Sequence, residues 1–348
     1  MRAPEGIFEY ARQYLTIIFL GITGSMLYNY FANTLRSLGD SQTPVLFLVL
    51  ASLVNIALDL FLIIVCRMDV AGAAVATAVS QLISGIGCLI VMIRRFPILK
   101  LTAADRRFSL KRSREMLGIG LPMGLQFSIT AIGSVMVQWS VNSLGVNAVA
   151  AVSAAGKLSM FFACMFDALA STMATFAGQN TGAHKLDRVH QGLRCASEIG
   201  IIYCLAALGI VLLFGDKMLG LFIDGGSEEV VEMGFRYLKI NAAFYIPLLF
   251  VNIVRLSIQG MGFTRVAMFA GLFEMVARTA VALLVVPAAG FTGACFANPA
   301  AWVMADLFLF PCYFRVMKNL HGRRMPGAEP VDGKAKESSN VRNIRRVA

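Results

Sequence analysis

Long apolar runs separated by short polar segments dominate the chain. We place nine of them, each long enough to cross a bilayer as a helix of about 20 to 28 residues, at residues 10–35, 44–66, 70–93, 116–142, 148–176, 195–215, 237–260, 264–287 and 291–316. Because lipid offers the backbone no hydrogen-bond partner, only helices and closed barrels span a membrane. A barrel would show short alternating strands of about ten residues. The pattern therefore predicts an all-α fold, a polytopic transmembrane helical bundle.

Composition supports a membrane protein. Hydrophobic residues make up 57% of the 348 positions, against 31 basic and 20 acidic residues. The net charge of +11 does not indicate nucleic-acid binding, because the basic residues cluster between apolar runs instead of forming a basic face. The seven cysteines lie in or beside apolar stretches without metal-ligand spacing, which is typical of small buried hydrophobic residues. We expect no cofactor and no metal centre.

The distribution of Lys and Arg predicts the orientation. Arg94 to Glu115 holds eight of them, Lys185 to Arg194 three, and the segment from Arg315 onward nine. These segments follow the third, fifth and ninth spans, so they share one side, which the positive-inside rule assigns to the cytoplasm. We expect a multi-pass protein of the plasma membrane with a cytoplasmic C-terminus and with Met1 outside. Residues 319–348 are expected to form a disordered basic tail.

An internal repeat relates the two ends of the chain. A shift of 223 residues places Tyr14-Leu15 on Tyr237-Leu238 and Gly39 on Gly262, and a two-residue gap continues the match from residues 70–76 to 291–297. The first three spans thus repeat as the last three, unless apolar helices match by chance. We expect a partial N-terminal lobe of three helices (1–95), a cytoplasmic linker (96–115) and a complete C-terminal lobe of six helices (116–318). Two similar bundles around a central site are typical of transporters.

Polar residues inside the spans are the candidate chemistry, because such groups are costly in lipid unless paired or functional. Asn55 and Asp59 lie four residues apart, on one helix face, and Thr77 on the next span can reach the same depth. Their hard oxygen atoms suit a proton or a small cation such as Na⁺. The alternative is that Asn55 and Asp59 only form interhelical hydrogen bonds.

The second copy of the repeat carries different chemistry. Asn55 corresponds to Arg278, and Glu274 lies one turn before it, which predicts an ion pair and no cation site. That pair is interpreted as structural, or alternatively as a lock between lobes. Asp167 is the candidate for a second proton site. Gln126, Met123 and Met160 offer an adaptable apolar surface for varied substrates, although ordinary helix packing explains them equally well.

Several motifs in this order and spacing resemble the multidrug and toxic compound extrusion (MATE) family. They are Leu35 to Pro44 (LRSLGDSQTP), Gly72 to Thr77 (GAAVAT), Ile119 to Pro122 (IGLP) and Gln179 to Ala183 (QNTGA). Members of this family are twelve-span antiporters with two six-helix lobes, so the resemblance implies that this chain corresponds to helices 4 to 12 and lacks the first three.

The resemblance also assigns roles to residues. It implies that Asn55, Asp59 and Thr77 belong to the cluster that binds the coupling ion in the N-terminal lobe, with Tyr14 and Asn29 at its border. The family's aspartate on the first helix has no counterpart in this sequence.

The function expected from these features is export of amphiphilic, cationic organic compounds, coupled to inward Na⁺ or H⁺. Alternatives are a lipid-linked saccharide flippase of the same superfamily and a non-transporting remnant. No motif of an intramembrane enzyme such as H-E-x-x-H or G-x-S-x-G occurs. The expected partners are an organic small molecule and membrane lipid. A fragment that supplies three further helices is another, because the chain as given is not expected to transport alone.

Overall fold

The structure is a computed structural model that describes residues 5–99, 108–221 and 228–322. All regular structure in these ranges is helical, so the predicted all-α fold is confirmed. Within the described ranges, eight helical segments are long and apolar enough to cross a membrane, and a ninth is added when the bent pair α7 and α8 counts as one span. The chain forms two units, residues 1–114 and 115–348, which are described separately below.

Unit 1 contains three long helices: α1 (Glu5–Ser37), α2 (Gln42–Leu60, continued by the π-helical turn η1, Phe61–Val65) and α3 (Asp69–Arg95). The short 3₁₀ turn η2 (Pro97–Leu99) follows α3. The helix α3 packs against both of the others, and most extensively against α1. The helices α1 and α3 come close together at Gly24 and Gly85. A Cβ atom at either position would lie within about 3 Å of the backbone of the opposite helix. Tyr28, Leu35 and Cys88 belong to the small apolar core.

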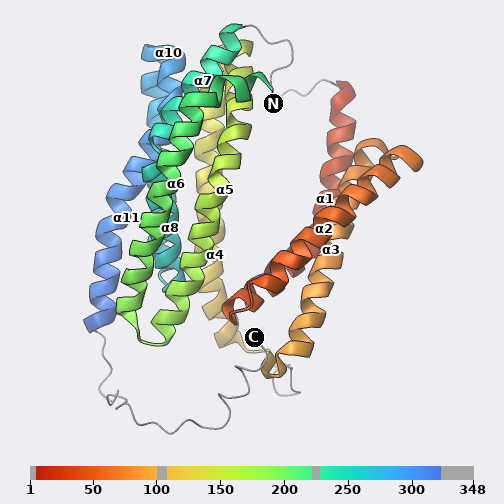
Figure 1. Cartoon of the computed structure of the whole chain (residues 1–348), viewed down its shortest axis with the longest axis vertical. Helices are drawn as coiled ribbons and strands as arrows, with labels where there is room; N and C mark the ends of the chain where they lie inside the picture. Colours follow the sequence, from red (N-terminus) through yellow and green to blue (C-terminus); the bar gives the residue numbers. More distant parts are fainter. Residues whose placement is uncertain (1–4, 100–107, 222–227, 323–348) are drawn as a thin grey trace. The chain divides into compact units, whose positions relative to one another are not determined.

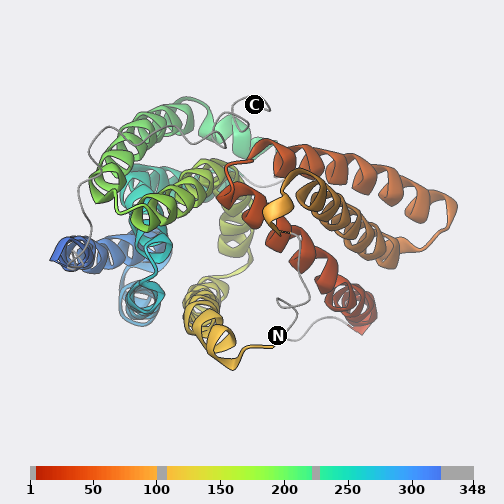
Figure 2. The same cartoon turned by 90° about the horizontal axis from the view of Figure 1, so that it is seen from below.

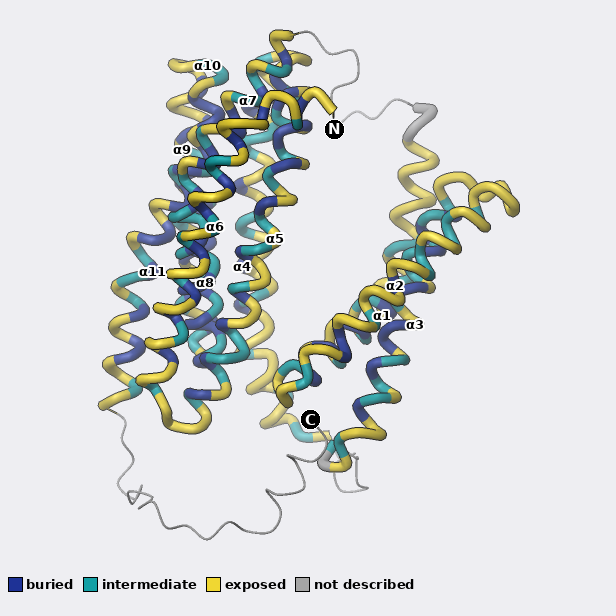
Figure 3. Tube along the Cα trace, viewed as in Figure 1, coloured by how far each residue is buried: buried dark blue, intermediate teal, exposed yellow. Residues whose placement is uncertain are grey.

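The helix α2 buries little of its surface within unit 1. Only Thr43, Pro44 and Ala51 along it are buried, and Figure 3 shows that most of its length is exposed. Its exposed side chains are almost all apolar, including Leu46 and Leu53. Such a surface suits a hydrocarbon environment, as expected for a helix that spans a membrane.

Unit 2 contains the remaining helices. They are α4 (Leu110–Asn142), α5 (Val146–Gly182), α6 (Leu186–Gly220), α7 (Glu228–Ala243), α8 (Tyr245–Gly260), α9 (Thr264–Ala280), the π-helical turn η3 (Val281–Val285), α10 (Val286–Cys295) and α11 (Ala297–Gly322). The long helices run alongside one another (Figures 1 and 2). The helix α5 packs against α6, α7 and α8, while α11 packs mainly against α8 and α9.

Aromatic and small residues hold the interior of unit 2 together. The ring of Tyr245 on α8 lies 5.5 Å from Phe166 and 6.2 Å from Phe162, centroid to centroid, and both phenylalanines come from α5. At the other end of α8, a Cβ atom on Gly260 would come within 2.2 Å of the carbonyl oxygen of Ala174. The two helices can therefore approach only because residue 260 is glycine.

The helices extend beyond several of the predicted spans. The helix α4 begins at Leu110 instead of 116, and α6 covers Leu186–Gly220 instead of 195–215. The reason is that apolar runs mark the part of a helix inside lipid, while Arg, Lys and Glu are good helix formers that continue it into water. The predicted linker 96–115 includes residues 100–107, and the predicted tail 319–348 includes residues 323–348. Both of these parts lie outside the described residues.

The backbone geometry agrees with the internal repeat. Gly39 and Gly262, which the shift of 223 residues superimposes, have φ angles of 92° and 93°. Each repeat then has a π-helical turn, η1 or η3, followed by a residue with positive φ, Asp69 at 46° or Gly290 at 59°. One difference is that α1 is continuous, whereas α7 and α8 meet at an angle of 51°.

Candidate functional site

Two polar side chains on α2 lack partners in the part of the chain that the structure describes. Asn55 and Asp59 are half-buried, and neither Asn55 Nδ2 nor Asp59 Oδ1, although both atoms are shielded from solvent, has a hydrogen-bond partner among the described residues. A buried polar atom without a partner costs about 1–3 kcal/mol. An unpaired amide beside an unpaired carboxylate, one turn apart, is therefore what a site for a small ligand would present.

Thr77 supplies the third oxygen of the predicted cluster. It is half-buried on α3, the helix packed against α2, and its hydroxyl donates to the carbonyl oxygen of Ala73 at 2.9 Å. Because the hydroxyl proton is used in this bond, the lone pairs of Thr77 Oγ1 are left to accept from or coordinate a ligand. Among the hydrogen bonds between described residues, none joins Thr77 to Asn55 or Asp59.

The two bordering residues on α1 lie on its exposed surface in unit 1. Tyr14 is 36% exposed. Asn29 is exposed as well, and its Nδ2 donates to the carbonyl oxygen of Ser25 at 2.8 Å, within the same helix. The structure thus places Asn55 and Asp59 together on one helix, with Thr77 on the adjacent one. Tyr14 and Asn29 are not linked to them by a hydrogen bond in the described part of unit 1.

The corresponding position in unit 2 holds the predicted ion pair. Arg278 Nη1 lies 3.4 Å from Glu274 Oε2, and the second carboxylate oxygen of Glu274 accepts a hydrogen bond from Arg255 on α8. All three side chains are buried. Glu274 is therefore shared by two arginines, which agrees with the interpretation that this position holds internal ion pairs.

Further polar groups extend this cluster across unit 2. Arg278 Nε donates to Asn298 Oδ1 at 3.3 Å, and Asn298 Nδ2 donates to the hydroxyl oxygen of Tyr237 at 3.0 Å. The side chain of Asn241 also belongs to the network, 3.4 Å from Asn298. The chain of contacts thus joins α7, α9 and α11. These hydrogen bonds and ion pairs connect charged and neutral side chains in one network, called the polar layer of unit 2 below.

The predicted substrate-cavity residues lie in different environments. Gln126 on α4 is buried and accepts a hydrogen bond of 2.7 Å from Gln259 on α8. Met123 is half-buried, and Met160 on α5 is 74% exposed. Asp167, the candidate second proton site, is exposed on α5. Of these residues, Gln126 already has a protein partner, whereas Met160 and Asp167 are accessible within unit 2.

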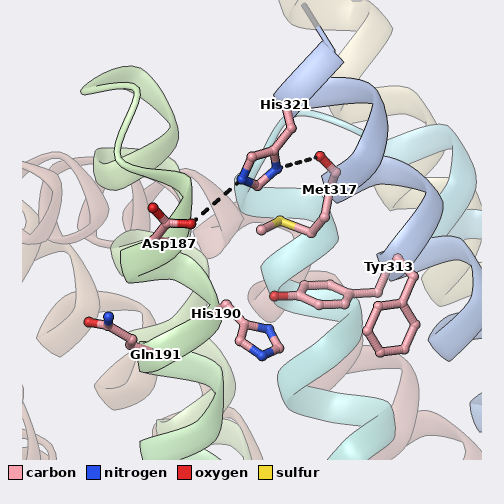
Figure 4. Close-up of a pocket in the computed structure, with 7 residues that line it drawn as sticks. Asp187, His190, Gln191, Tyr313, Met317 and His321 are labelled. Carbon is pink, nitrogen blue, oxygen red and sulfur yellow. Dashed lines mark hydrogen bonds and ion pairs between the residues drawn. The ribbon is translucent and has the colours of Figure 1, made fainter. Parts of the chain in front are cut away.

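A cavity of about 470 Å³ lies where the start of α6 meets the end of α11. Figure 4 shows the imidazole of His190 facing Tyr313, with ring centroids 6.5 Å apart, and Asp187 pointing toward His321. The distance from His321 Nε2 to Asp187 Oδ1 is 3.6 Å. Asp187 is almost fully solvent-exposed, so this is a shallow opening at the end of the helices and not an interior binding chamber.

An ionic contact outside the spans ties the α1–α2 turn to the end of α3. Asp40 accepts hydrogen bonds from the backbone and side chain of Thr43, at 3.0 and 2.7 Å, and from Arg95 at 3.1 Å. Partial burial acts to raise the pKa of Asp40, but these hydrogen bonds and the positive charge of Arg95 outweigh it, so the pKa is lowered overall.

Several polar residues of unit 2 had no predicted role. Asn298, Tyr237 and Gln259 are polar residues within apolar runs, and this is the feature of the sequence that marks them as candidates. Arg255 and Asp306 carry charge inside predicted spans, yet their neighbours come from helices far apart in sequence. Periodicity along one helix therefore could not show which of these groups meet.

The chain is similar in sequence to a family of membrane transport proteins. The family model described as MatE matches residues 1–61 and 122–284. "Probable multidrug resistance protein YpnP" of Bacillus subtilis (strain 168) is 33% identical over 256 residues, which are 73% of this chain and 56% of that protein. The "FAD transporter" of Shewanella oneidensis is 26% identical over 220 residues, 62% of this chain and 48% of that protein. The chain thus spans about half the length of these curated relatives.

Solved structures show the same fold. A crystal structure titled "MATE in the bent conformation" matches with a TM-score of 0.82, and a MOP superfamily transporter from Pyrococcus furiosus, whose title describes reverse polarity of its binding pocket, matches with a TM-score of 0.85. Both are 21% identical to this chain and cover 92% of it; the chain in turn covers 71% and 72% of them. The family model, which matches more than half of the chain, shows that this multi-pass membrane protein belongs to the MATE family.

Proposed function

We propose that the protein exports amphiphilic, cationic organic compounds across the plasma membrane, and that inward movement of Na⁺ or H⁺ drives this export by alternating access. The coupling ion binds at Asn55, Asp59 and Thr77. Three points support the proposal: membership of the MATE family, the name of the relative from Bacillus subtilis, and the unpaired polar atoms on α2. The last of these observations carries the assignment of the site.

The chemistry of the three residues fits a small cation. Asp59 supplies the charge, because it is the only carboxylate of the cluster. Asn55 contributes an amide oxygen, and Thr77 contributes a hydroxyl oxygen whose proton is already donated to Ala73. Oxygen ligands of this kind suit Na⁺. The same carboxylate takes up a proton if H⁺ is the coupling ion. Tyr14 and Asn29, on the surface of α1, are proposed to border this site when it is occupied.

The proposed substrate surface lies on α4 and α5. Met160 is accessible and Met123 is partly so. Methionine side chains adapt to ligands of different shape because they are flexible and polarisable. Gln126 contributes a hydrogen bond to substrate only if its contact with Gln259 opens. Asp167, exposed on α5, is proposed as a second proton carrier.

The decisive experiment replaces Asp59 with Asn in a full-length version of the protein reconstituted into liposomes. Gradient-driven efflux of a fluorescent organic cation should fall by about tenfold or more. The reason is that a loss of about 1.4 kcal/mol of binding free energy weakens binding of the coupling ion tenfold, and the efflux depends on that binding. The substitution keeps the volume of the side chain, so expression and thermal stability should remain near normal.

Asp69→Asn provides the matched control. Asp69 is an exposed carboxylate at the first position of α3, with a φ angle of 46°, a conformation that Asn tolerates. This variant should transport like the parent protein. Normal coupled efflux by Asp59→Asn would contradict the proposed site and would direct attention to Asp167.

A second substrate class belongs in the same assay. The relative named "FAD transporter" makes an anionic, phosphate-containing compound a competitor to the cationic one. Liposomes loaded with the organic cation or with FAD distinguish the two directly. Efflux of FAD without efflux of the cation would contradict the proposed substrate class while leaving the Asp59 site to be tested with FAD.

A further inference from the structure

Asp306 is a buried carboxylate that the unit 2 network does not satisfy. It lies in the middle of α11, is only 9% exposed, and its Oδ1 atom has no hydrogen-bond partner within the described residues. Neighbours on its own helix are apolar, with Ala305 and Leu309 fully buried. An ionised carboxylate in such surroundings is costly unless another group compensates it.

A source of compensation is Arg255 on α8, whose positive charge interacts electrostatically with Asp306. The two side chains, however, form no direct ion pair in the part of the chain that the structure describes, because Arg255 is instead hydrogen-bonded to Glu274. Arg255 Nε is itself buried and has no partner there. Asp306 and Arg255 thus each keep an unused polar atom in the same region.

The net charge of these buried side chains depends on whether Asp306 is ionised. Glu274 carries one negative charge and is shared by two arginines, Arg255 and Arg278. The layer therefore has one excess positive charge when Asp306 is neutral, and no excess when Asp306 is ionised. Protonation of one carboxyl group changes the net charge of a buried layer by one unit.

Among the described residues, the other helices packed on α11 offer no competing counter-charge at this position. Their buried titratable groups are the arginines and Glu274 described above, Tyr237 on α7, Tyr245 on α8, Cys204 on α6 and Cys295 on α10. His190 on α6 is exposed, and its imidazole stacks on Tyr313 further along α11. Tyr237 is occupied by Asn298. Arg255 is consequently the group that senses whether Asp306 is charged.

We propose that Asp306 is a proton-binding site of unit 2, neutral while Arg255 is held by Glu274 and ionised when Arg255 turns toward it. The proton passes between the carboxylate oxygen and water, and no covalent bond other than O–H forms or breaks. A role of this proton in transport rests on the proposed function. Proton binding by Asp306 can be measured without transport.

Arg255 connects this site to the helix that carries the proposed substrate surface. Gln259 lies four residues after Arg255 and therefore on the same face of α8, and it donates to Gln126 on α4. The arginine of the proposed proton site and the hydrogen bond that joins α8 to α4 thus lie one turn apart on one face of α8.

Infrared difference spectroscopy of the purified full chain tests the proposal. On going from neutral to alkaline pH, ordinary Asp and Glu side chains, whose pKa values lie near 4, stay ionised. We expect a carboxylic acid C=O band to disappear over this change and to be absent from Asp306→Asn. Asp306→Glu should retain a titrating band at a shifted frequency, because it keeps the acid.

Glu232→Gln is the control, because Glu232 is an exposed carboxylate paired with Arg236; it should leave the band unchanged. Asp306→Asn should also keep the melting temperature of the parent at neutral pH, since the amide resembles the neutral acid. A static, permanently ionised Asp306 would give no titrating band and a lower melting temperature for Asp306→Asn, and either result overturns the inference. Failure of the Asp59 experiment leaves these measurements unaffected.

Discussion

At the scale of single residues, the two copies of the repeat differ in whether their carboxylates within the helices have partners. Glu274 in unit 2 has a partner for each carboxylate oxygen, whereas Asp59 Oδ1 in unit 1 has none among the described residues. A satisfied carboxylate stabilises its surroundings, while an unsatisfied one remains available to a ligand. Stability and ion binding are thus expected to depend on different residues.

The first prediction concerns Glu274→Gln. Removing this charge leaves two buried arginines without their shared partner, and breaking a buried ion pair in this way costs about 3–5 kcal/mol. The melting temperature in detergent, followed by circular dichroism, should fall strongly. Glu232→Gln breaks an exposed pair with Arg236, worth about 0–1 kcal/mol, and should change it little. Equal melting temperatures for the two variants would mean that the buried pairs do not hold unit 2 together.

The second prediction concerns pH and Asp40. Since the pKa of Asp40 is lowered in the folded protein, its bonds to Thr43 and Arg95 contribute fully above the usual Asp pKa of about 3.9, and are lost as the pH falls through the lower folded value. Asp40→Asn should therefore melt below the parent at neutral pH, and the difference should shrink in acid. Melting curves recorded over a pH series check this; a difference that grows on acidification would refute it.

At the scale of helices, close packing depends on glycines at a few crossings. Gly260 on α8 lies against the backbone of Ala174 on α5, where a Cβ atom would approach within 2.2 Å. Because the obstacle is backbone and not a flexible side chain, the helices must separate to accept a methyl group. Packing of this kind lets helices associate in lipid, where burial of apolar surface gives little advantage.

Gly260→Ala is expected to destabilise the protein by about 1–3 kcal/mol, the usual cost of overpacking. Gly209→Ala on α6 is its counterpart, because a Cβ atom there meets nothing within 4 Å, and alanine gains up to about 1 kcal/mol of helix propensity. Thermal unfolding should separate the two variants in opposite directions. A neutral effect of Gly260→Ala would show that α5 and α8 can move apart without loss.

The sequence predicted the helices better than the contacts between them. Apolar runs located every span, and Gly39 and Gly262 marked matching turns, because both signals are local. The ion pair between Glu274 and Arg278 was also predictable, since four residues of spacing place them on one face. The contact from Arg255 to Glu274 was not, because it joins two helices whose relative rotation depends on packing across all of unit 2.

At the scale of the whole molecule, polar contacts join segments that the predicted topology places on one side of the membrane. Asp40 pairs with Arg95, and Asp187 with His321, and all four are assigned to the cytoplasmic side. Asn147 donates to Glu229 at 3.0 Å, and both are assigned to the outside. Each contact joins segments separated by an even number of predicted spans, as two segments on one side of a membrane require.

Cysteine labelling tests the orientation directly. In a variant without native cysteines, Ser143→Cys and Ala183→Cys introduce thiols at exposed positions in the turns at either end of α5. We expect a membrane-impermeant reagent to label position 143 from outside the cell, and position 183 only after the membrane is opened. Labelling of both positions from the same side would contradict the number of spans, and exchanged sides would contradict the positive-inside assignment.

The matching turns of the repeat show which features the two copies have in common. Gly39 and Gly262 have φ angles of 92° and 93°, and Asp69 and Gly290 both have positive φ, whereas Asn55 and Asp59 correspond to Arg278 and Ala282 in the second copy. Turn geometry admits few residue types, but the interior of a helix accepts many. The two copies therefore agree in the turns that fix where their helices reverse, and differ in the polar groups that their helix interiors present.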